Sequence, residues 1–154
     1  MARRGTAKRT GARAPAKARE KKPKAVGGCL CGAVRYEVRG PLRPVINCHC
    51  GQCRKFHGHY GAYSNAATKD ISITGYRSLK WYRSSSFARR GFCKECGSSL
   101  FWERLKSGTI SIAAGTLDAP TKLKTIRHLF VEHMGDYYRI SDKLERLPGT
   151  MGAN

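Results

Sequence analysis

The chain has 154 residues, of which 30 are Lys or Arg and 10 are Asp or Glu, so its formal net charge at pH 7 is +20. This length suits one domain with a hydrophobic core. No segment approaches the roughly 18 consecutive apolar residues of a membrane span, which excludes an integral helical membrane protein. The basic excess favours anionic partners.

Residues 1–24 form the most densely charged block. They contain ten Lys or Arg, one acid (Glu20) and no bulky hydrophobic residue after Met1, a net charge of +9. Such a segment cannot bury enough apolar surface to offset its ordering entropy, so we predict a disordered basic tail at 1–24 and a folded domain at 25–150. The tail is expected to bind nucleic acid or another polyanion, or to act as a nuclear or organellar targeting segment. The alternative is a solubilising extension without a specific partner.

Short β-prone runs separated by turns follow the tail. They lie at 33–38, 59–64, 71–74, 79–82, 100–103, 109–114 and 127–131. No window has a long apolar period of 3.6 residues, so we expect only short helices, with one turn near 54–57. This spacing is typical of an all-β sandwich or small barrel-like body. The pairs Trp81–Tyr82 and Phe101–Trp102 fall within these runs and are expected to pack in the core or on a sheet face rather than stack on bases.

The seven cysteines fall into three clusters: Cys29 and Cys31, then Cys48, Cys50 and Cys53, then Cys93 and Cys96. Disulfides are the alternative to metal binding, but an odd number leaves one thiol over, and no secretory signal places the chain in an oxidising compartment. Short C-x-C and C-x-x-C spacings suit a zinc ion. We therefore predict metal binding, with reduced cysteines that favour a cytoplasmic location.

The first and last clusters are predicted to form one closed structural zinc site. Glycines flank both knuckles, with Gly28 before Cys29 and Gly97 after Cys96, and they allow the backbone to turn tightly around sulfur. A metal that joins these two pairs would close a loop of some sixty residues. Structural zinc can contribute on the order of 10 kcal/mol of folding free energy.

The central cluster offers three thiolates and leaves a fourth metal position vacant. An open position separates a catalytic zinc from a structural one, because a thiol or an activated water can bind there. The alternative is a second structural site completed by a histidine, since His49, His57 and His59 lie nearby along the chain. His49 stands between two ligands and would have to point away from the metal. His57 and His59 are candidate ligands or proton-transfer groups, and each is equally compatible with a surface position.

Four motifs now carry a resemblance: GGCLCGAVRY from Gly27, NCHCGQCRK from Asn47, FCKECGSSLFW from Phe92 and AAGTLD from Ala113. The chain resembles the family of glutathione-dependent formaldehyde-activating enzymes, also named for centromere protein V, from about Gly27 to Leu147. The resemblance implies a β-tent fold of small antiparallel sheets stapled by zinc. It also implies two zinc ions, a structural one at Cys29, Cys31, Cys93 and Cys96 and a catalytic one at Cys48, Cys50 and Cys53.

The family resemblance further implies carbon–sulfur lyase chemistry with glutathione as co-substrate and an adduct such as S-hydroxymethylglutathione. The expected catalytic set is the cysteine triplet with His57 and His59 as proton-transfer groups. Arg54 and Lys55 are expected to attract the carboxylates of glutathione. The basic tail is more similar to the chromatin-associated branch, and Tyr137–Tyr138 stand where a tryptophan-containing segment is expected.

Two functions therefore remain open. One is a zinc-dependent lyase that acts on a small thiol adduct. The other is a zinc-stapled β module that binds nucleic acid or chromatin through its basic tail. The sequence does not decide the oligomeric state, the physiological substrate or the direction of the reaction.

Overall fold

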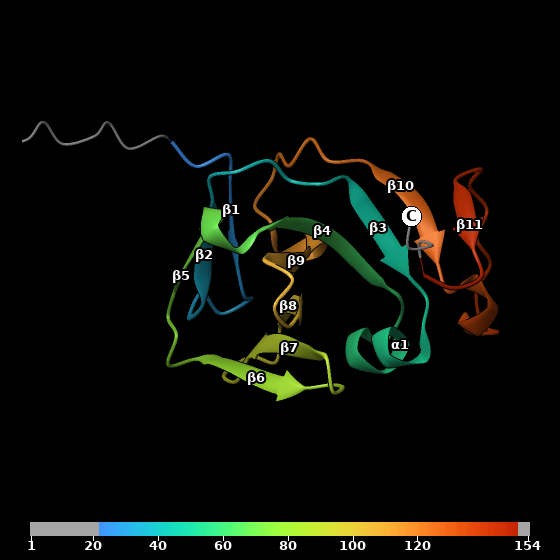
Figure 1. Cartoon of the computed structure of the whole chain (residues 1–154), viewed down its shortest axis with the longest axis horizontal. Coiled ribbons are helices and arrows are strands. Elements are labelled where there is room, and N and C mark those ends of the chain that lie inside the picture. The colour runs from blue at the N-terminus through green and yellow to red at the C-terminus, as the bar shows by residue number, and fades with distance from the viewer. Residues whose placement is uncertain (1–21, 151–154) are drawn as a thin grey trace, which may run out of the picture.

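The structure is a computed structural model that describes residues 22–150 (Figure 1). Most of the predicted tail therefore lies outside the described residues. The described part is mostly β-sheet, as expected for an all-β protein, with one α-helix and three short 3-10 helices (Thr68–Asp70, Ala114–Thr116 and Val131–His133). None of its helices is long and apolar enough to cross a membrane.

A small antiparallel sheet contains β1 (Ala25–Gly28), β2 (Arg35–Val38) and β5 (Ile71–Thr74), in the order β1-β2-β5. Burial alternates along β2, as expected for a strand with one face on the core. Tyr36 and Val38 are buried, and Glu37 between them is only half-buried. This is the period-two pattern that predicted strands at 33–38 and 71–74.

The larger sheet has eight strands in the order β11-β10-β3-β4-β9-β8-β7-β6. Their bounds are β3 Val45–Cys48, β4 Gly61–Ala67, β6 Leu79–Arg83, β7 Ala88–Cys93, β8 Ser99–Arg104, β9 Thr109–Ala113, β10 Thr125–Leu129 and β11 Glu145–Leu147. The pairings are antiparallel except for β3 with β10 and β10 with β11, which are parallel. In Figure 1 the chain of strands curves around, so that β6 and β7 lie below β4 and β9.

Aromatic side chains hold the two sheets together. Tyr36 of the small sheet meets Phe101 of the large sheet edge to face, with ring centroids 5.2 Å apart, and Trp81 stacks on Phe101 at 6.1 Å. Phe101 is fully buried, and Tyr36 is 2% exposed. Burial of such side chains contributes about 1.5–3 kcal/mol each. The predicted packing role of Phe101 and Trp81 agrees with these contacts, whereas Tyr82 is exposed.

The single α-helix of the described residues, α1 (Gly51–His57), starts at a cysteine. The Cys50 side chain accepts a hydrogen bond from the backbone N–H of Cys53 and so caps the helix. The helix ends at Gly58, whose φ of 75° places it in the left-handed region, and its N–H binds the carbonyl of Arg54. α1 is thus one turn longer at its start than the segment predicted at 54–57.

Four strands were not expected from the sequence: β1, β3, β7 and β11. In β3, Val45, Ile46 and Asn47 are all buried, so the strand shows no alternation. In β7 the buried positions include Arg90, which breaks the apolar pattern on which strand prediction depends. β11 spans three residues and is mostly exposed.

Gly75, in the turn after β5, gives a test of the packing of this turn against Ala33, which lies just before β2. Its φ is 76°, and a Cβ atom there would overlap the carbonyl oxygen of Ala33. We expect Gly75→Ala to lower the free energy of unfolding by more than about 2 kcal/mol, because it combines left-handed strain with a backbone clash. Gly108→Ala is the matched control, since Gly108 has a φ of 71° but open space around a Cβ. It should cost about 1 kcal/mol. Equal losses in urea denaturation of the two variants would contradict the packing described here.

Candidate metal centres and active site

Cys29, Cys31, Cys93 and Cys96 converge at one point, although about sixty residues separate the pairs. Cys29 follows β1, and Cys93 ends β7, so the cluster joins the small sheet to the large one. The Sγ atoms of Cys29 and Cys31 lie 3.6 Å apart, and those of Cys31 and Cys93 lie 3.8 Å apart. We call these four residues the staple.

The donor set of the staple fits zinc. Four sulfurs that each lie about 2.3 Å from a zinc ion are about 3.8 Å apart along the edges of the tetrahedron. All four ligand atoms lie within 4.8 Å of one another. The cysteines are free rather than joined in disulfides. Backbone groups support the same geometry, since the N–H of Val34 lies 3.2 Å from the sulfur of Cys29.

Cys48, Cys50 and Cys53 form the second convergence of sulfurs, also within 4.8 Å of one another. We call them the triplet. Cys48 is the last residue of β3, Cys50 caps α1 and Cys53 lies in its first turn, so a strand end and a helix start aim three thiols at one point. Hydrogen bonds from the thiols of Cys48 and Cys53, together with backbone N–H groups, hold the pKa of Cys50 well below its usual range. The triplet can therefore carry anionic sulfur suited to a metal.

Arg90 is the positive charge beside the triplet. It lies on β7 and is only 3% exposed. Its Nη2 atom lies 3.7 Å from the sulfur of Cys53 and 3.4 Å from Oε1 of Gln52, and Nη1 lies 3.4 Å from the hydroxyl of Tyr63. A buried guanidinium needs a compensating negative charge, and Cys50, whose pKa is lowered, is the thiol of the triplet that can supply one.

His57 joins the same network through Tyr63. The ring Nε2 of His57 lies 2.6 Å from the hydroxyl of Tyr63, and Tyr63 is 6% exposed. Burial, and secondarily the charge of Arg90, lower the pKa of His57 to about 4, so this imidazole is neutral at pH 7. The hydroxyl of Tyr63 therefore lies between the guanidinium of Arg90 and Nε2 of His57.

The side chain of His49, between Cys48 and Cys50, contacts Tyr138 and His128 rather than the sulfurs of the triplet. It is fully buried, and its Nδ1 lies 2.5 Å from the hydroxyl of Tyr138 while its Nε2 lies 2.8 Å from Nδ1 of His128. Nε2 of His128 in turn lies 3.1 Å from the carboxylate of Asp142. Burial, followed by the charges of His128 and His59, lowers the pKa of His49 to about 4. This series of side chains anchors the turn between Cys48 and Cys50 to β10 and to the C-terminal segment.

The remaining predicted residues are dispersed around α1. His59 lies 3.3 Å from the hydroxyl of Tyr137 and packs against Tyr60 and Tyr138, with centroid distances of 4.4 Å. Within residues 22–150, neither His57 nor His59 belongs to the sulfur cluster, so the histidine-completed site has no support in this geometry. Arg54 is half-buried and its charge acts on Tyr138, whereas Lys55 is exposed on another side of the helix.

Sequence reasoning missed Arg90, Tyr63 and His128. Arg89 and Arg90 are adjacent in sequence and equally basic, yet Arg89 pairs with Glu103 near the surface, and Arg90 is buried. Tyr63 and His128 reach the site only through strand pairing. The one usable signal was the position of Arg90 three residues before Cys93, on a run that leads into the staple.

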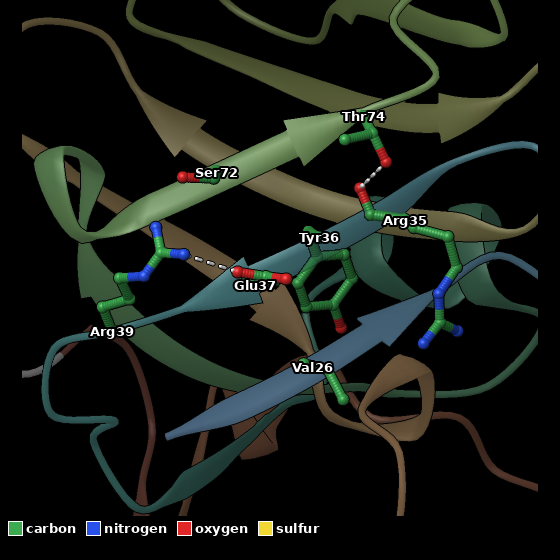
Figure 2. Close-up of a pocket in the computed structure, with 7 residues that line it drawn as sticks. All are labelled: Val26, Arg35, Tyr36, Glu37, Arg39, Ser72 and Thr74. Atoms are coloured by element: carbon green, nitrogen blue, oxygen red, sulfur yellow. Dashed lines mark hydrogen bonds and ion pairs between the residues drawn. The ribbon is translucent and has the colours of Figure 1, made fainter. Parts of the chain in front are cut away.

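Two cavities lie on the described part of the chain near charged residues. One, of about 320 Å³, lies on the small sheet and is lined by Val26, Arg35, Tyr36, Glu37, Arg39, Ser72 and Thr74 (Figure 2). Its guanidinium groups are paired, Arg39 with Glu37 at 3.0 Å and Arg35 with Asp118. The other, of about 240 Å³, is lined by Gln52, Lys55, Phe56, Tyr82, Ser84 and Arg90, and it adjoins the triplet through Arg90.

The staple predicts a large stability effect for a single ligand. Cys96→Ser removes one thiolate of four, and structural zinc can contribute on the order of 10 kcal/mol to folding. We expect this variant to lose several kcal/mol of unfolding free energy and to lose most of the dependence of its melting temperature on chelators. Cys50→Ser, in the triplet, should lose far less unfolding free energy, because the triplet does not join the small sheet to the large one. Thermal unfolding with and without EDTA compares the two, and equal melting temperatures for Cys96→Ser and the unaltered chain would contradict a metal staple.

Comparisons with known proteins identify a family and several similar proteins. Residues 24–133 match the family of glutathione-dependent formaldehyde-activating enzymes. An uncharacterized lyase of Schizosaccharomyces pombe is 35% identical over 81 residues, which cover 52% of this chain and 58% of that protein. A Halomonas elongata protein provisionally named as a glutathione-dependent formaldehyde-activating enzyme is 28% identical over 130 residues, which cover 76% of this chain and 81% of its own length.

A solved structure has a similar fold. The crystal structure of a Rhodobacter sphaeroides protein superimposes with a TM-score of 0.53 at 25% identity, covering 61% of this chain and 88% of that one. The family match spans well over half of the 154 residues. The chain belongs to the family of glutathione-dependent formaldehyde-activating enzymes.

Proposed function

We propose that this protein is a zinc-dependent carbon–sulfur lyase that acts on glutathione or a related thiol adduct such as S-hydroxymethylglutathione. The observation that carries the proposal is the triplet, three convergent sulfurs that no fourth protein ligand joins within residues 22–150. The names of the S. pombe and H. elongata relatives support the same class of reaction. In this proposal the staple holds a structural zinc and the triplet a catalytic one.

The reaction needs a thiolate and a place for the developing charge. In the synthetic direction the thiol sulfur bonds to the carbonyl carbon of formaldehyde, the C=O π electrons move to the oxygen, and the proton lost by the thiol ends on that oxygen. Zinc on the triplet would supply the Lewis acid that lowers the pKa of the thiol. The reverse reaction breaks the same carbon–sulfur bond and returns the proton to sulfur.

The protein's own groups provide charge balance and proton transfer. Arg90 offsets the negative charge of the thiolates at 3.7 Å from Cys53. His57 is neutral at pH 7, because burial and Arg90 lower its pKa, and its part in proton transfer would run through the hydroxyl of Tyr63, 2.6 Å from its Nε2. Tyr63 links His57 to Arg90 and fixes the orientation of the imidazole. We place His57 ahead of His59 in this role, since the ring of His59 contacts the hydroxyl of Tyr137, outside this network.

Cys50→Ser tests the lyase. Loss of one of three thiolates should abolish formation of S-hydroxymethylglutathione above the uncatalysed rate, while the circular dichroism spectrum and the metal of the staple are retained. The rate is measured by exchange NMR on the equilibrium between glutathione, formaldehyde and their adduct, in the presence of the zinc-loaded chain. Cys50 also caps α1, and serine keeps that hydrogen-bond acceptor, so the helix should survive. Unchanged turnover in the folded variant would refute the proposal.

A second function, binding of nucleic acid or another polyanion, depends on residues 1–24. Their ten basic residues and one acid favour binding through counterion release. Most of this segment lies outside the described residues, so its role stays a prediction, as does a cytoplasmic location. Removal of residues 1–24 should weaken DNA or RNA affinity and flatten its dependence on salt, measured by fluorescence anisotropy from 50 to 200 mM salt. Absence of salt-dependent binding by the full chain would rule this function out.

A further inference from the structure

The cavity beside the triplet lies between α1 and the hairpin formed by β6 and β7. Gln52, Lys55 and Phe56 contribute from the helix, and Tyr82, Ser84 and Arg90 contribute from the hairpin. Gln52 ties the two sides together, because its Nε2 donates to the carbonyl of Ser84 at 3.2 Å and its Oε1 accepts from Arg90 at 3.4 Å. The cavity is therefore built from ordered secondary structure.

The cavity is cationic. Lys55 and Arg90 line it, and no carboxylate is among its lining residues. The hydrogen-bond partners of Arg90 are Tyr63, Gln52 and Cys53, none of them a carboxylate. Its neighbour Arg89 shows the contrast, since it pairs with Glu103 at 2.5 Å. A pocket with two cations and no acid favours an anionic ligand group.

The position of Arg90 relates this cavity to the chemistry. Arg90 is one of the residues that line the cavity, and its guanidinium lies 3.7 Å from the sulfur of Cys53, so the cavity and the triplet share this residue. A thiol whose sulfur lies at the triplet can place a group a few bonds away in the cavity. The rings of Phe56 and Tyr82 flank the same space and suit the methylene groups of such an arm.

We propose that this cavity binds a carboxylate of the thiol co-substrate and so selects anionic thiols over neutral and cationic ones. Lys55 contacts the carboxylate directly, and Arg90 supplies the buried positive charge between carboxylate and thiolate. The inference rests on the proposed function, because it takes the reacting sulfur to be at the triplet. The proposal assigns different roles to two adjacent basic residues. Lys55 lines the cavity, whereas the charge of Arg54 acts on Tyr138, outside the cavity lining.

S-methylglutathione tests the cavity without the reaction. Its sulfur is a thioether that cannot become a thiolate, so its binding to the zinc-loaded full-length chain reports recognition of the rest of the molecule. We expect isothermal titration calorimetry to show about tenfold weaker binding for the diethyl ester of S-methylglutathione and for Lys55→Glu. Lys69→Glu is the matched control, since Lys69 is exposed on the 3-10 helix Thr68–Asp70 and changes the net charge equally. That variant should bind like the unaltered chain.

Three outcomes would overturn the inference: no binding of S-methylglutathione, equal binding of its diester, or equal binding by Lys55→Glu and Lys69→Glu. Turnover of glutathione and formaldehyde by the unaltered chain is measured in parallel. Turnover without a dependence of binding on Lys55 rejects the carboxylate cavity and leaves the lyase standing. Absence of turnover in the zinc-loaded chain rejects the lyase itself.

Discussion

The close approach of seven cysteine sulfurs is the constraint on which the rest of this structure depends. Seven sulfurs are gathered into two groups, and within each group the ligand atoms lie within 4.8 Å of one another. Anionic sulfurs at such distances need a compensating cation, and zinc is the ion whose geometry the staple fits. Through the staple, β1 and β2 are held to β7 and β8, so the two sheets are fixed around Tyr36 and Phe101.

The triplet meets the same constraint differently. In the proposed function, zinc with three thiolates would have a net charge of −1, and the buried guanidinium of Arg90 would bring the local sum to zero. A further thiolate can then bind without a second uncompensated negative charge. The same residue lines the cavity beside α1 and contacts Tyr63, which in turn orients His57. One buried cation would thus link the metal ligation, proton transfer and substrate recognition that we propose.

Local sequence patterns correctly predicted those features of the fold that interactions between neighbouring residues determine. Cysteine spacing indicated three knuckles, because a C-x-C or C-x-x-C turn is formed within a few residues, and alternation predicted β5 at 71–74. Local sequence patterns failed where contacts between residues far apart in the sequence determine the structure. β3 is buried at three consecutive positions, and β7 carries a charge into the interior, since Cys53 and Tyr63 lie there to receive it. The parallel pairing of β3 with β10, which brings His128 to His49, has no local signal at all.

The open coordination position of the triplet is the central claim, and zinc K-edge X-ray absorption before and after addition of glutathione tests it most directly. With two zinc ions bound, one on four sulfurs and one on three, the mean number of sulfur neighbours should rise when the thiol binds, at the expense of a light-atom ligand. A spectrum that shows four sulfurs per zinc from the start, or no change with saturating glutathione, would contradict an open three-thiolate site.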